Sequence, residues 1–129
     1  MAKKFNRNNW IKAKIRFISL RYPPRTEAKR LARVERGRYK CSMCQVDTFR
    51  ENEIHIDHIN PVVPLNNDWE YGSIDWGVYI PNLFCDVENL QALCITCHSS
   101  KSQIEDAMRK KFREIKREKK KLDKKLKEE

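Results

Sequence analysis

The chain lacks any apolar run long enough to cross a membrane, so we expect no membrane partner. Its basic start leads into residues 10–14, which are interrupted by lysines where a signal peptide would be continuously apolar. Only five cysteines occur in 129 residues, and four of them form two C-x2-C pairs. Such pairs are typical of metal binding in a reducing compartment rather than of disulfides. These features predict a one-domain protein of the cytoplasm.

Basic side chains are nearly absent from the middle of the chain. Residues 41–100 contain Arg50 as their only basic residue against 9 acidic residues, a net −8. Residues 1–40 carry 14 basic and 2 acidic residues, a net +12, and residues 101–129 carry 13 and 7, a net +6. Two phosphate-holding arms around a cation-holding centre would give this pattern, and so would a solubilising surface. Beside cysteine pairs, the basic arms favour a nucleic-acid partner.

The N-terminal arm has the pattern of two helices. Isoleucines recur at helical spacing over residues 10–21, and the pattern ends at Pro23. A second helix is predicted over about residues 25–36, with alanines and a leucine inward and basic residues outward. Gly37 would end this helix. The arm should pack on the core and present arginines to a DNA backbone.

The remaining chain alternates between strand and helix signals. Strict alternation over residues 53–59 predicts a strand. An apolar excursion over 62–88 follows, with a short helix expected near 76–84. Residues 89–93 lead into the second cysteine pair as a strand or turn. After that pair, residues 99–127 have the apolar spacing of a helix.

The two cysteine pairs predict a structural zinc site. Each C-x2-C turn can aim two thiolates at one ion, and four thiolates complete a tetrahedral shell. Four buried thiols without metal are the alternative interpretation. Cys85 lies in an apolar stretch and is expected to be a small core residue. The predicted zinc ligands are Cys41, Cys44, Cys94 and Cys97.

Other polar residues remain once zinc has four thiolates. Neighbouring helical side chains point about 100° apart, so His98 should face a different site from the cysteine before it. Strand alternation puts His55 and Asp57 on one face and His58 on the other. That alternation allows His55 and Asp57 as metal ligands with His58 in the core. Twisting at the strand end would instead bring Asp57 and His58 to one cleft.

Three ordered segments resemble the HNH endonucleases, specifically the zinc-braced bacterial and bacteriophage type. They are residues 56–61 (IDHINP), 89–94 (NLQALC) and 97–101 (CHSSK), and the resemblance covers roughly residues 37–101. It implies a ββα-metal core, in which two antiparallel strands and a helix surround one divalent ion.

The resemblance also organises the chain. It predicts an α+β protein in which the ββα-metal core is braced by a four-cysteine zinc site. A basic helical arm (1–40) would precede the nuclease core (41–101), and a long basic C-terminal helix (102–129) would follow, all in one compact domain. If the chain is phage-encoded, the compartment is the host cytoplasm.

The resemblance implies a role for each polar residue. Asp57 and His98 would hold a catalytic divalent cation, Mg²⁺, Mn²⁺ or Ni²⁺, and His98 counts with the catalytic residues. His58 would be the general base that takes a proton from the attacking water. Asn89 would tie the loop between the strands and help to orient His58. His55 has no role in the family and is interpreted as structural or DNA-facing. The implied activity is metal-dependent hydrolysis of DNA phosphodiester bonds.

Double-stranded DNA is the expected partner, bound through its phosphates. Two alternatives are a zinc-braced DNA-binding module without chemistry and an accessory factor of a phage DNA-packaging (terminase) machine. The residues expected to contact DNA lie close to the motifs in sequence, and they are Arg30, Arg33, Arg36, Arg38, Lys40 and Lys101.

Overall fold

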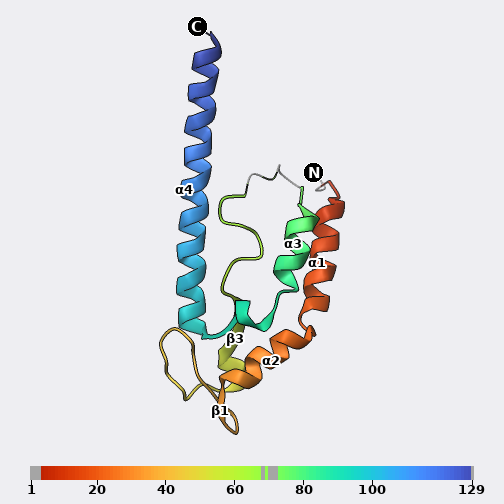
Figure 1. Cartoon of the computed structure of the whole chain (residues 1–129), viewed down its shortest axis with the longest axis vertical. Coiled ribbons are helices and arrows are strands. Elements are labelled where there is room, and N and C mark those ends of the chain that lie inside the picture. The colour runs from red at the N-terminus through yellow and green to blue at the C-terminus, as the bar shows by residue number, and fades with distance from the viewer. Residues whose placement is uncertain (1–3, 68, 70–72, 129) are drawn as a thin grey trace.

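The computed structural model describes residues 4–67, 69 and 73–128, and it is a mixed α+β protein, as predicted. Its described part contains four α-helices and two small antiparallel sheets (Figure 1). In chain order the elements are α1 (Arg7–Ser19), α2 (Pro23–Ala32), β1 (Arg33–Glu35), β2 (Arg38–Tyr39), η1 (Glu51–Glu53), β3 (Ile54–His58), α3 (Trp76–Leu83), η2 (Val87–Asn89), β4 (Leu90–Cys94) and α4 (Ile95–Glu128), where η marks a short 3-10 turn.

Both predicted N-terminal helices form, but the second is shorter than predicted. The prediction of a helix over 25–36 is wrong beyond Ala32, where the chain enters the β1–β2 hairpin. Gly37 has a φ of +73° and makes the hairpin turn rather than a helix end. After the hairpin, Tyr39 N–H donates to Phe49 O at 2.8 Å, so the chain that follows the first cysteine pair runs antiparallel to β2. The hairpin returns the chain toward the first cysteine pair.

The strand predicted over 53–59 is confirmed as β3, which pairs with β4 in antiparallel register. The register runs from Ile54 opposite Cys94 to His58 opposite Leu90. β4 is buried over most of its length, so the sheet carries the core of the fold. A buried cluster of Cys41, Leu93 and Cys94 lies at one end of this sheet. Cys41 and Cys94 are therefore part of the core.

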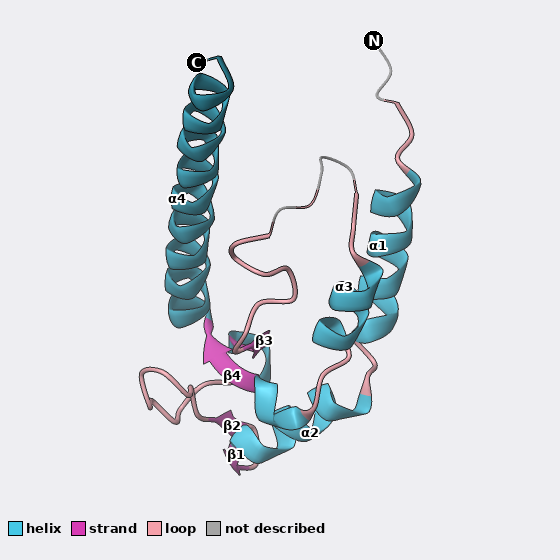
Figure 2. Cartoon of the chain, turned by 45° about the horizontal axis from the view of Figure 1, so that its top comes forward, coloured by secondary structure: helices cyan, strands magenta, loops and turns pink. Residues whose placement is uncertain are grey.

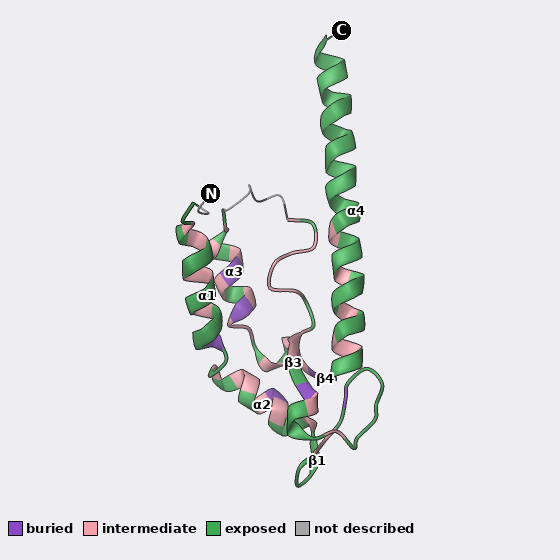
Figure 3. Ribbon diagram, turned by 180° about the vertical axis from the view of Figure 1, so that it is seen from behind, coloured by how far each residue is buried: buried purple, intermediate pink, exposed green. Residues whose placement is uncertain are grey.

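The helix predicted over 99–127 is present but begins earlier, at Ile95, directly after β4. Its first turn therefore contains Cys97 and His98. Its far half extends past the rest of the molecule and is exposed on every side (Figures 1 and 3). Within the described residues, no helix combines the length and apolar character that a membrane span requires.

The excursion between the strands contains α3, which confirms the short helix predicted near 76–84. α3 lies beside α1, where the Lys12 ammonium is 5.9 Å from the centre of the Tyr79 ring. Tyr22 donates from its hydroxyl to Phe84 O at 3.2 Å and holds the end of this segment against the start of α2. Figure 2 shows the result: α1 and α3 stand on one side, α4 on the other, and β3 and β4 lie at their base.

Candidate active site

The four cysteines of the two C-x2-C pairs come together in space. Their sulfur atoms all lie within 4.8 Å of one another, and Cys44 Sγ is 4.0 Å from Cys94 Sγ. A zinc ion binds thiolates at about 2.3 Å, which sets tetrahedral sulfurs roughly 3.8 Å apart. The predicted ligand set Cys41, Cys44, Cys94 and Cys97 could therefore hold zinc, and Cys85 does not join it.

Short backbone contacts build this cysteine cluster. Gln45 N–H donates to Cys41 O at 3.0 Å and closes a tight turn, in which Gln45 has a φ of +63°. Ser42 N–H donates to Ala92 O at 2.9 Å and fixes the turn to β4. The second cysteine pair spans the junction of β4 and α4. Backbone geometry thus positions both pairs of thiols.

The thiols of the cluster differ in their pKa values. Burial opposes ionisation of Cys41, but backbone hydrogen bonds, above all with Cys94 and Cys44, lower the pKa of its thiol to about 6. Hydrogen bonding with Cys94 raises the pKa of Cys97 to about 12. Thiolates packed this closely repel one another unless a cation lies among them. Zn²⁺ fits this donor set in charge and in softness.

Asp57 and His98 face each other across β3 and α4. His98 Nε2 lies 3.7 Å from Asp57 Oδ1. Ligand atoms about 2.0–2.1 Å from one hard ion are separated by roughly 3–4 Å, so the pair could share a divalent cation. The ring of His55 stacks on that of His98, with centroids 5.2 Å apart. In the described part of the chain, His55 does not complete a three-ligand cluster with Asp57 and His98.

Lys101 is the second partner of Asp57. Its Nζ lies 3.0 Å from Asp57 Oδ2, contacts Glu105 and donates to His58 O at 2.9 Å. Burial opposes its charge, but hydrogen bonds to Glu105 and Asp57 outweigh burial and raise the pKa of Lys101. Its side chain is 16% exposed. Lys101, predicted as a DNA contact, lies inside the site, where it leaves Oδ1 of Asp57 turned toward His98.

His58 lies on the face of β3 opposite to that of Asp57, as the alternation of side chains along a strand requires. Its Nε2 is 3.1 Å from the carbonyl oxygen of Leu83 at the end of α3. A carbonyl only accepts hydrogen bonds, so Nε2 carries the ring proton and Nδ1 keeps its lone pair. Burial is the main cause that lowers the pKa of His58, and the charge of Arg25 lowers it further. The ring is therefore neutral at pH 7 and offers Nδ1 as a base.

Asn89 ties down the chain directly after β3. Its Oδ1 accepts from Asn60 N–H at 2.9 Å, and its Nδ2 donates to Asn60 O at 3.4 Å. The Asn89 carbonyl also accepts from Ile59 N–H at 2.8 Å. These contacts hold the two residues that follow His58. The position agrees with the expected loop tie, and any influence on His58 passes through the backbone.

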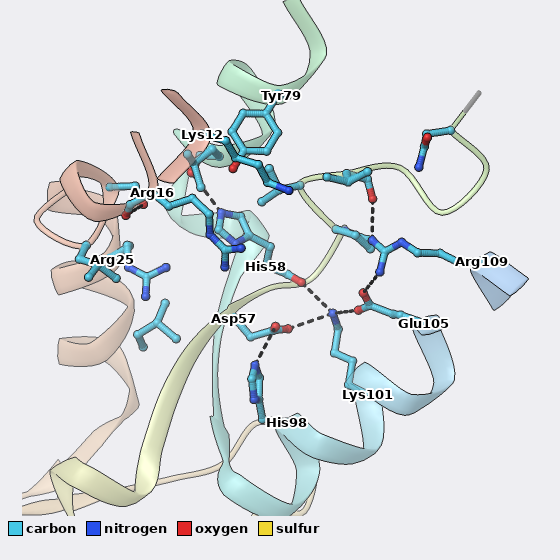
Figure 4. Close-up of a pocket in the computed structure, with 18 residues that line it drawn as sticks. Lys12, Arg16, Arg25, Asp57, His58, Tyr79, His98, Lys101, Glu105 and Arg109 are labelled. Carbon is cyan, nitrogen blue, oxygen red and sulfur yellow. Dashed lines mark hydrogen bonds and ion pairs between the residues drawn. The ribbon is translucent and has the colours of Figure 1, made fainter. Parts of the chain in front are cut away.

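One cavity of about 540 Å³ is lined by Asp57 and His58 of β3, which point from opposite faces of the strand, and by His98 of α4 (Figure 4), whereas Asn89 does not line it. The chain that follows β3, at Pro61 and Val62, forms part of its wall. The polar and charged residues that line it are Lys12, Arg16, Ser19, Arg25, Asp57, His58, Asn67, Tyr79, His98, Lys101, Glu105 and Arg109. The chain thus brings the predicted Asp57, His58 and His98 to a common space.

Apart from Lys101, the basic side chains in this cavity differ from those that the sequence singled out. Lys12 and Arg16 come from α1, and Arg25 comes from α2. Their signal in the sequence was the i, i+4 spacing of Lys12 and Arg16 on one helix face, which exposed basic residues share. The five residues predicted to contact DNA from the arm lie elsewhere, on α2 and around the β1–β2 hairpin: Arg30, Arg33, Arg36, Arg38 and Lys40.

Some of these arm residues already have protein partners. Arg30 forms an ion pair with Glu27 at 2.6 Å, and Arg38 donates to Thr48 O at 3.3 Å. Neither contact is buried, so both side chains remain accessible to an external phosphate.

Comparison with protein-family models, curated proteins and solved structures found no match to this chain.

Proposed function

We propose that the protein is a metal-dependent HNH-type endonuclease that hydrolyses phosphodiester bonds of double-stranded DNA. One observation carries the proposal: the half-buried neutral imidazole of His58, whose Nδ1 keeps its lone pair, shares a cavity with a carboxylate–imidazole pair spaced for one ion. A base and a cation site side by side are what hydrolysis of a phosphodiester requires.

The proposed core is a ββα-metal unit made of β3, β4 and α4. Asp57 on β3 and His98 on α4 would hold the divalent cation, and Mg²⁺, Mn²⁺ and Ni²⁺ all suit an oxygen–nitrogen pair. When bound, such an ion would neutralise negative charge on the phosphate and stabilise the leaving oxygen. The cysteine cluster would hold a structural zinc and fix the start of α4.

His58 would act as the general base. Leu83 O holds the proton on Nε2, so Nδ1 is the atom that takes a proton from water. Burial disfavours the imidazolium and keeps the base form populated at neutral pH. The backbone tie from Asn89 limits movement of the chain that carries the ring. General-base catalysis of this kind typically contributes about 10²- to 10⁴-fold.

A zinc-braced DNA-binding module without chemistry is the second candidate. The observation that favours it is the ion pair between Lys101 and Asp57, because an ammonium already neutralises the carboxylate that a divalent ion would need. In the nuclease proposal, Lys101 instead holds Oδ2 while Oδ1 faces His98. Association with a phage packaging machine stays a prediction, and co-purification with such a machine would test it.

Cleavage of supercoiled plasmid with added Mg²⁺, Mn²⁺ or Ni²⁺ tests the nuclease proposal. The buffer is depleted of divalent ions with a chelating resin, because a soluble chelator would also remove structural zinc. We expect nicked or linear plasmid only when metal is added. Asp57→Asn should abolish cleavage, and Asp47→Asn, an equal charge change at an exposed position, should not. DNA binding without cleavage at every metal would favour the binding module.

A further inference from the structure

The cavity beside His58 contains more positive charge than its carboxylates can balance. Lysines and arginines contribute five side chains to its wall, whereas Asp57 and Glu105 are its only carboxylates among the described residues. Both carboxylates are engaged by cations of α4: Lys101 contacts both, and Arg109 Nη1 lies 4.0 Å from Glu105. Three of the five cations therefore remain outside these ion pairs.

These three are Lys12, Arg16 and Arg25. Across residues 4–67, 69 and 73–128, none of their charged groups forms an ion pair or a hydrogen bond. Lys12 instead lies over the ring of Tyr79, 5.9 Å from its centre, and both belong to the cavity wall. The three cations come from two separate helices and line the same cavity. Basic residues that only keep a surface solvated would have no need to converge in this way.

The positive charges of these three side chains repel one another. Burial, followed by the charge of Arg16, lowers the pKa of Lys12, and the same two causes lower that of Arg25. The charge of Arg25 also lowers the pKa of His58, and the charge of Asp57 offsets part of the lowering of the pKa of Arg25. Figure 4 shows Arg16 and Arg25 on one side of His58, with Lys101 on the other. Like charges collected in a partly buried cavity favour an anion that neutralises them.

The geometry of the charged donor groups in this cavity suits the oxygens of a phosphate. Two guanidinium groups present planar donor forks that match tetrahedral phosphate, and an ammonium adds a point charge. A cavity of about 540 Å³ is larger than a single phosphate ion needs and can accept a segment of polymer backbone. The neighbouring groups, His58 and the Asp57–His98 pair, are those that we propose act on a phosphodiester.

We propose that Lys12, Arg16 and Arg25 form a phosphate cradle that binds a backbone phosphate of duplex DNA next to His58. The identity of the ligand as DNA rests on the proposed function, but binding in the cradle requires no cleavage. The helices α1 and α2 then belong to the active site itself, and the hairpin arginines hold DNA only at a distance from it.

Binding of a fluorescent duplex oligonucleotide tests the cradle in resin-treated buffer without added metal. The variant Arg16→Gln/Arg25→Gln removes two cradle charges. The matched control Arg7→Gln/Arg21→Gln removes two exposed charges from α1 and the turn after it, outside the cavity. We expect the cradle variant to bind about tenfold more weakly or worse, with the slope of log K against log[salt] reduced by about 1.8, since each duplex phosphate contact contributes about 0.9. The control should lose less than about twofold.

Thermal unfolding provides a second readout. Inorganic phosphate should raise the melting temperature of the wild type above its value in chloride at equal ionic strength, and it should not do so for the cradle variant. At low salt without phosphate, the cradle variant should melt at or above the wild-type temperature, because repulsion is relieved. A lower melting temperature would show that these arginines have stabilising partners and would overturn the proposal.

The outcomes separate the cradle from the nuclease. Weaker binding by the cradle variant supports the cradle even if the wild type cuts no plasmid with any metal. Equal binding by the cradle variant and its control rejects the cradle, even if the wild type cuts DNA.

Discussion

The cysteine cluster, which could hold zinc, and the Asp57–His98 pair, which we propose as a cation site, are arrangements of opposite character. The cluster has four ligands within 4.8 Å of one another, and Cys41 and Cys94 are buried in the core. The pair offers only two ligand atoms, 3.7 Å apart, at the wall of a cavity. A full ligand shell suits structure, whereas a partial shell leaves positions for substrate and water. The two sites are therefore expected to respond differently to mutation.

The same short segment supplies both sites. Cys94 ends β4, while Cys97 and His98 occupy the first turn of α4. Adjacent helical side chains diverge, so Cys97 joins the cluster while His98 faces Asp57. Closing the cluster consequently fixes the direction of His98. In the proposed account, the structural site thus orients a residue of the reactive site without sharing a ligand with it.

The largest expected effect comes from breaking the cysteine cluster. Cys94→Ser removes a buried thiolate from a site whose zinc would contribute on the order of 10 kcal/mol to folding. We expect the variant to lose zinc and to unfold at room temperature, as measured by metal analysis and circular dichroism. Cys85→Ser, outside the cluster, is the control and should keep its zinc. A Cys94→Ser variant with wild-type zinc content and stability would contradict the structural role.

The next effect concerns the base. His58→Ala should lower the plasmid cleavage rate by about 10²-fold or more, with little change in DNA affinity, because the base acts in the transition state. His55→Ala, which removes an exposed ring stacked on His98, serves as the control and should keep most activity. If His55→Ala loses cleavage and His58→Ala does not, then the base is wrongly assigned.

A smaller effect is expected from the loop tie. Asn89→Ala removes both side-chain hydrogen bonds to Asn60, and each such bond contributes about 1 kcal/mol. We expect a loss of roughly 1–2 kcal/mol in the free energy of unfolding and a moderate loss of cleavage, measured by urea titration and plasmid assay. The exposed Asn52→Ala is the control. Unchanged stability in Asn89→Ala would remove the tie from the account.

The smallest effect concerns pH. A general base must be neutral, so the cleavage rate should rise with pH through the pKa of His58. Burial, with help from the charge of Arg25, lowers this pKa below its ordinary value of 6.5, which places the acid limb of the profile below that pH. Arg25→Gln removes one lowering charge and should move the limb to higher pH, while Arg21→Gln should not. A limb that stays in place or moves down in Arg25→Gln would contradict this electrostatic role.

Local patterns predicted part of this structure. The alternation over 53–59 predicted β3 because it reflects one buried face, and the C-x2-C spacing predicted the cysteine cluster because such turns converge on one ion. Gly37 misled the helix prediction, since a positive φ ends a helix and makes a hairpin turn equally well. The termini of helices and strands depended on partners distant in sequence, such as Phe49 opposite Tyr39.

Contacts between distant elements limited prediction of the site. Nothing near Lys101 in the sequence separates a DNA-facing lysine from one turned toward Asp57, because the contact spans 44 positions of chain. The convergence of Lys12, Arg16 and Arg25 depends in the same way on how α1 and α2 pack beside β3 and α3. Tertiary packing, not local propensity, decides which charges enter the cavity.

Zinc content and cleavage measured together in His98→Ala test the central claim of two independent sites most directly. The account predicts about one zinc per chain, as a four-cysteine site holds a single ion, together with loss of metal-dependent plasmid cleavage. His98→Ala protein that has lost its zinc, or that keeps its zinc and still cuts at the wild-type rate, would contradict the account.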